Sequence, residues 1–92
     1  MLSKLEQEIE LTLRHIAILK FVIEQGPIGI MKLSELSGYP QHKVRYSLRI
    51  LEQQNLIKPS SQGAIAPPKA KKFMRMLPTK VKQLSEKLKR EI

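Results

Sequence analysis

The chain contains no cysteine, no tryptophan and no aspartate among its 92 residues. Without cysteine it can form neither a disulfide framework nor a thiolate metal site, which suits a reducing compartment. The two histidines and the scattered glutamates do not have the spacing of metal ligands. The sequence also has no Gly-rich phosphate loop and no supported Ser/His/acid arrangement. We therefore expect no metal, no cofactor and no enzymatic activity.

Aromatic residues and long apolar runs are scarce as well. Only two Tyr and two Phe are present, so the core must be built from Leu, Ile, Val and Met. The apolar share of 41% predicts a folded chain, and the length predicts one domain, residues 1–92. No apolar run approaches the roughly 18 residues of a membrane span, and residues 1–10 lack the apolar region of a signal peptide. We expect a cytoplasmic protein with no membrane partner.

Positive charge is abundant and unevenly placed. The formal net charge is +9; residues 1–30 carry three Lys/Arg and four Glu, whereas residues 31–92 carry fourteen Lys/Arg and four Glu. A basic excess confined to part of a small domain indicates a polyanionic partner. The alternative is a Lys-rich surface that only aids solubility.

The hydrophobic spacing predicts helices over residues 3–25, 31–37, 41–54, 69–77 and 80–90. Ser3 is expected to cap the first helix, with Glu6 completing a capping box, and Gly26-Pro27 to end it. Gly38 supplies a left-handed turn before the third helix, and Pro78 interrupts or kinks the last helical region.

Three short β-like pieces separate these helices. Residues 28–30 are expected to form a brief strand, and residues 56–58 and 64–66 to form a small hairpin around the turn-forming residues 59–63. The expected fold is therefore mainly α with a small β-hairpin.

The order of elements is that of the winged helix-turn-helix. Residues 33–57, LSELSGYPQHKVRYSLRILEQQNLI, resemble the helix-turn-helix of small archaeal and ArsR/MarR-type transcriptional regulators. The resemblance implies a winged-helix DNA-binding domain with extended N- and C-terminal helices, a helix-turn-helix over residues 31–55 and a wing over residues 56–67. Residues 66–73 match the segment after the wing less well, because Ala66 and Ala70 stand where such proteins have Thr and Gly.

The third helix fits a recognition role on its own residues. Burial of Val44, Leu48 and Leu51 would leave a face of long polar side chains without an acid before Glu52, and such a face suits the major groove of double-stranded DNA. The alternative is an ordinary solvated face. The candidate DNA-binding residues of the third helix are Gln41, His42, Lys43, Arg45, Tyr46 and Arg49.

Weaker candidates for DNA contact lie outside this helix. Lys32 is placed to meet a phosphate beside the start of the second helix. Ser60, Ser61 and Gln62 form the expected wing tip, which lacks the Arg and Lys of many relatives. His15, between apolar neighbours, is expected to be a partly buried structural residue.

Two apolar stripes predict a homodimer. Leu5 and Ile9 in the first helix, and Val81, Leu84 and Leu88 in the last, exceed what one small core can cover. Residues 1–15 and 78–92 would then form the dimer interface and present two recognition helices about one DNA turn apart. The alternative is that the two stripes pack on each other within one chain.

Three functions remain open from the sequence. The first is a sequence-specific transcriptional regulator. The second is a weakly specific architectural DNA-binding protein, and the third is a protein-interaction domain that never touches DNA. A small-molecule effector is neither indicated nor excluded by the sequence.

Overall fold

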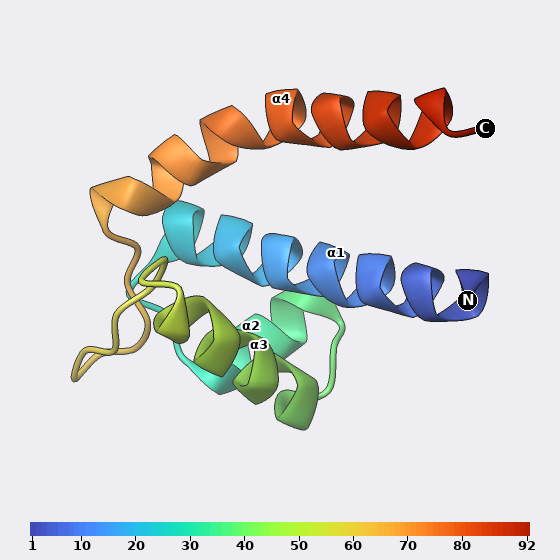
Figure 1. The fold of residues 1–92 in the computed structure, drawn as a ribbon. Coiled ribbons are helices and arrows are strands. Elements are labelled where there is room, and N and C mark those ends of the chain that lie inside the picture. The colour runs from blue at the N-terminus through green and yellow to red at the C-terminus, as the bar shows by residue number, and fades with distance from the viewer.

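A computed structural model describes all residues, 1–92, as four helices, with short connections up to α3 and a longer one before α4 (Figure 1). They are α1 (Leu2–Gln25), α2 (Ile30–Ser37), α3 (Gln41–Gln53) and α4 (Pro68–Arg90). No strand forms, so the expected fold with a β-hairpin, and with it a winged helix, is wrong. No helix is both long enough and apolar enough to cross a membrane.

The core is aliphatic, as the composition predicts. Eleven buried hydrophobic residues form one cluster to which the second half of α1, α2, α3 and the first turns of α4 all contribute. Ile18, Leu19, Leu33, Val44 and Ala70 are fully buried in it. This cluster holds α3 against α1 and α2, and it thereby fixes which face of α3 is left to solvent.

The boundaries of the first three helices agree with the sequence to within one residue, but some details differ. α1 begins one residue earlier than expected, so Ser3 lies inside the helix and does not cap it. Leu36 is 37% exposed, and the short α2 contacts the core through the fully buried Leu33 and the partly buried Ile30. Ile28 makes only a single isolated bridge, and the expected strand over residues 28–30 is absent.

Residues 56–67, which we call the 56–67 loop, take the place of the expected hairpin. Lys58 pairs with Ile65 through two backbone hydrogen bonds of 2.8 and 2.9 Å, and the next residue, Ala64, pairs with Ile28 instead. Consecutive residues of an extended segment direct their backbone hydrogen-bonding groups to opposite edges, so Ala64 and Ile65 pair with different segments, and each pairing stays an isolated bridge. Beyond Lys58, Ser60 and Gly63 exchange backbone hydrogen bonds of 3.0 and 3.2 Å, which close the turn at the tip of the loop. The wing is therefore replaced by a loop held by two separate bridges.

α4 is one continuous helix, not two. Pro78 lies inside it, where its ring removes the hydrogen bond to the carbonyl of Met74. Figure 1 shows α4 changing direction between its first and second halves, which is the usual effect of an internal proline. Pro78 therefore kinks the helix but does not interrupt it.

The first half of α1 and the second half of α4 extend beyond the core. The two helices run in opposite directions, so both chain termini lie at the same end of the molecule (Figure 1). Each of these halves carries an apolar stripe that the chain leaves uncovered. The α1 stripe, 44–70% exposed, consists of Leu2, Leu5, Ile9 and Leu13. The α4 stripe, 52–57% exposed, consists of Val81, Leu84 and Leu88.

Candidate nucleic-acid interface

α3 is anchored by one face and open on the other. Val44, Ser47 and Leu51 are buried, and Leu48 is partly buried against the core. The side chains that the sequence predicted to contact DNA are all exposed. They are Gln41, His42, Lys43, Arg45, Tyr46 and Arg49.

The cations of this face have no carboxylate partner. The single ion pair in the chain joins Lys32 and Glu35, whose nitrogen and oxygen are 3.9 Å apart. Lys43, Arg45 and Arg49 therefore keep their full charge for an external anion. Lys32, on α2, is solvent-exposed and only loosely paired, because two exposed side chains hold such a geometry weakly.

The turn between α2 and α3 sets the direction of α3. Gly38 adopts a left-handed conformation with φ of 80°, as predicted, and its N–H donates to the carbonyl of Ser34. The Ser34 hydroxyl donates to the carbonyl of Tyr39 at 2.6 Å, so it stabilises the turn. No side chain caps α3, which leaves its first backbone amides without an intrahelical partner. Such amides suit a phosphate oxygen.

The C-terminus of α3 ends in a second left-handed residue. Asn55 has φ of 60°, its N–H donates to the carbonyl of Glu52, and the N–H of Leu56 donates to the carbonyl of Leu51. This pair of bonds is the Schellman arrangement, with Asn in the position that glycine usually takes. Asn55 lies one residue beyond the cap, Gln54.

A polar cluster that the sequence did not reveal ties α3 to α1. Ser47, fully buried, accepts a hydrogen bond from Nε of Arg14 at 3.2 Å and lies 2.7 Å from Nδ1 of His15. Arg14 donates to the hydroxyl oxygen, and which of Ser47 and His15 donates to the other depends on the tautomer of the His15 ring. Burial, and secondly the charge of Arg14, lower the pKa of His15 below its usual range.

His15 is thus the partly buried structural residue that the sequence indicated. Its ring also lies 6.0 Å, centroid to centroid, from the ring of Tyr46. Tyr46 is 41% exposed, so it belongs to the open face of α3 and to the contact with α1 at once. The hydrophobic pattern could not reveal Ser47, because a serine on the inner face of a helix looks like an interruption of that pattern.

The tip of the 56–67 loop offers polar groups but little charge. The Ser60 hydroxyl donates to the carbonyl of Gly63 and accepts from the N–H of Gln62, so it is used within the loop. Ser61 and the Gln62 side chain are exposed. Among the predicted loop residues, these two remain available to a partner.

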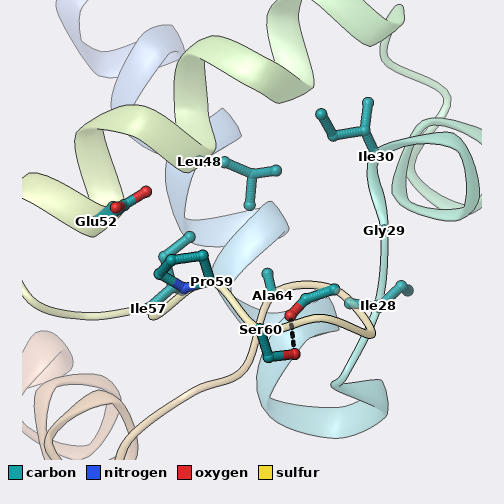
Figure 2. A pocket seen from close by; sticks show the side chains of 10 residues that line it. Ile28, Gly29, Ile30, Leu48, Glu52, Ile57, Pro59, Ser60 and Ala64 are labelled. Carbon is teal, nitrogen blue, oxygen red and sulfur yellow. Dashed lines mark hydrogen bonds between the residues drawn. The ribbon is translucent and has the colours of Figure 1, made fainter.

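A pocket of about 300 Å³ lies where the loop meets α3. Figure 2 shows Leu48 and Glu52 from α3 on one side and Ile57, Pro59 and Ser60 from the loop on another. Its lining is largely apolar and comes from both the loop and the C-terminal half of α3. The loop and the C-terminal half of α3 therefore border one pocket.

The predicted dimer residues are exposed and lie on the two extended helices, away from α2 and α3. Leu5 and Ile9 face outward on α1, and Val81, Leu84 and Leu88 face outward on α4. No three His, Cys, Asp or Glu side chains come together as a metal site.

No family model matches the chain, and no curated protein matches it.

Proposed function

We propose that this chain is a sequence-specific DNA-binding transcriptional regulator that inserts α3 into the major groove. The observation that carries the proposal is the exposed face of α3, on which Lys43, Arg45 and Arg49 have no acidic partner. An α-helix with side chains is about 10–12 Å across, and the major groove is about 12 Å wide. Arg can bond guanine edges in a bidentate manner, and Gln can do so with adenine.

The surroundings of α3 supply the contacts that would position it. Lys32 and the uncapped N-terminus of α3 suit backbone phosphates, and these contacts add affinity without reading sequence. Ser61 and Gln62 on the 56–67 loop can add neutral hydrogen bonds to the sugar-phosphate backbone. The proposal places sequence reading on α3 and gives the loop a minor part.

The proposed regulator acts as a homodimer in the cytoplasm. Two copies would present two α3 helices to successive major grooves, roughly 34 Å apart on the DNA. The two uncovered apolar stripes support the dimer, because a monomer would leave both of them in water.

Fluorescence anisotropy with labelled DNA duplexes tests the proposal. A binding site is first enriched from random duplexes, and the affinity of the chain for this site is compared with that for a scrambled duplex at two salt concentrations. We expect preference for the site by a factor of about 10³ or more and a steep loss of affinity with salt. The Arg45→Glu/Arg49→Glu variant should bind the site at least about 100-fold more weakly.

The matched control is Lys71→Glu/Lys72→Glu, which changes net charge equally but on exposed positions of α4. Equal losses in both double variants would mean that bulk charge, not α3, binds DNA. A preference below tenfold would favour an architectural DNA-binding protein, which the basic excess of residues 31–92 also fits. Absence of binding in all variants near physiological salt would refute any DNA role and leave protein interaction.

A further inference from the structure

The flanks of the α1 stripe are acidic. At 3.6 residues per turn, Glu6 and Glu10 lie along one side of this stripe and Glu8 lies along the other. Lys4 is the one cation between residues 2 and 13, and it lies on the opposite side of the helix. The uncovered apolar surface of α1 is thus bordered by negative charge on both sides.

The flanks of the α4 stripe are basic. Lys80 and Lys87 lie along one side of it and Lys89 along the other, by the same helical geometry. Glu86 is the one acid between residues 80 and 90, and it lies on the far side of the helix. The two stripes are therefore alike in apolar character and opposite in the charge of their borders.

These charges find no partner within the chain. α1 and α4 extend to the same end of the molecule, yet the single ion pair of the structure is on α2, between Lys32 and Glu35. The stripe residues also keep about half of their surface exposed. The expected alternative, in which the two stripes cover each other within one chain, is not what the fold forms.

We infer that the occupant of these stripes is a second copy of this chain, with α1 of one copy packed along α4 of the other. A two-fold axis makes the contact twice, so both stripes of both copies are buried together. Each acidic border then meets a basic border, in the manner of the charged positions that flank the apolar seam of a coiled coil. This arrangement rests on the proposed homodimer but not on DNA binding.

Pairing like with like is the arrangement that the charges oppose. If α1 met α1 of the partner and α4 met α4, the three glutamates would face glutamates and the three lysines would face lysines. Like charges across an interface suppress a pairing. The charge borders thus select α1 against α4 among the symmetric ways of joining two copies.

Complementary charge reversal tests this pairing by sedimentation equilibrium without DNA. The acid-reversed variant carries Glu6→Lys, Glu8→Lys and Glu10→Lys. The base-reversed variant carries Lys80→Glu, Lys87→Glu and Lys89→Glu. All six positions are exposed, and far-ultraviolet circular dichroism is the check that each variant keeps its helices.

Each variant alone should dimerise about tenfold or more weakly than the wild type, because its reversed border faces a like charge. An equimolar mixture should form mixed dimers with an affinity within a few fold of the wild type, since opposite borders then meet at both contacts. The Lys71→Glu/Lys72→Glu/Arg75→Glu variant changes three charges of α4 away from the stripe and should dimerise as the wild type does.

The failing outcomes are distinct. A wild type that stays monomeric up to about 1 mM would overturn the homodimer itself. If the wild type dimerises but mixing the two reversed variants does not raise their dimerisation affinity, the α1–α4 pairing is overturned. If the acid-reversed variant binds the wild type more tightly than either chain binds itself, α1 pairs with α1 of the partner, which would also overturn the α1–α4 pairing. The Arg45→Glu/Arg49→Glu variant should dimerise normally, so failure of the DNA proposal leaves this result intact.

Discussion

Replacing Ser47 with alanine removes both side-chain hydrogen bonds that join α1 to α3. The Ser47 hydroxyl is fully buried and contacts Arg14 and His15, and no buried polar side-chain atom of the chain lacks a partner. A hydrogen bond contributes about 0.5–1.5 kcal/mol net, and one to a charged group about 1.5–3 kcal/mol. Arg14 and His15 are only partly buried, so water can replace part of the loss. We therefore expect Ser47→Ala to lower the free energy of unfolding by about 2 kcal/mol.

The assay is urea unfolding followed by circular dichroism at one fixed protein concentration, because dimerisation makes apparent stability depend on concentration. Ser61→Ala, at an exposed position, is the matched control and should change stability by less than about 0.5 kcal/mol. Arg14→Met should lower the free energy of unfolding less in the Ser47→Ala background than in the wild type, with a coupling energy of roughly 0.5–1 kcal/mol. A Ser47→Ala variant as stable as Ser61→Ala would refute the structural role of this hydroxyl.

Three further predictions concern single positions. The pKa of His15 is lowered in the folded chain, so the unfolded chain binds the proton first as pH falls. The free energy of unfolding should therefore be highest above about pH 6.5 and should decrease between pH 6.5 and the lowered pKa. A His15→Gln variant whose free energy of unfolding decreases equally over this range would contradict this. Gly63 has φ of 125°, and a Cβ there would lie 2.5–2.8 Å from backbone atoms of Ile28, so Gly63→Ala should lower the free energy of unfolding by about 1–3 kcal/mol. Gly29→Ala, where a Cβ would meet no atom within 4 Å, should lower it far less. Equal thermal midpoints of the two variants would contradict this strain at Gly63. Asn55 is in the left-handed conformation, so Asn55→Ala should lower the free energy of unfolding by about 1 kcal/mol and Asn55→Gly should not. Chemical unfolding of the two variants tests this, and equal free energies of unfolding would contradict it.

The helices and the open face of α3 could be predicted because they depend on local rules. Val44 and Leu51 recur at helical spacing, which predicts that they are buried and that Arg45 and Arg49 are exposed. All four residues are placed as this spacing predicts. Gly38 marks its turn because few other residues adopt a left-handed conformation without cost.

The errors arose where tertiary contacts decide. Residues 56–58 and 64–66 have a hairpin pattern, but they form a single bridge, Lys58 with Ile65, and Ala64 bridges to Ile28, a residue distant in sequence. Pro78 was expected to interrupt or kink the last helical region, and one helix runs through it with a change of direction. Ser47 was missed because its partners lie on another helix, 32 and 33 positions away.

The central claim is that α3 reads DNA through the face bearing Arg45 and Arg49. Its most direct test is to map backbone amide chemical shifts by nuclear magnetic resonance while the enriched duplex is added. The proposal predicts that the largest changes fall on residues 41–49, with smaller changes around Lys32. Changes confined to α4, or none at saturating duplex, would contradict it.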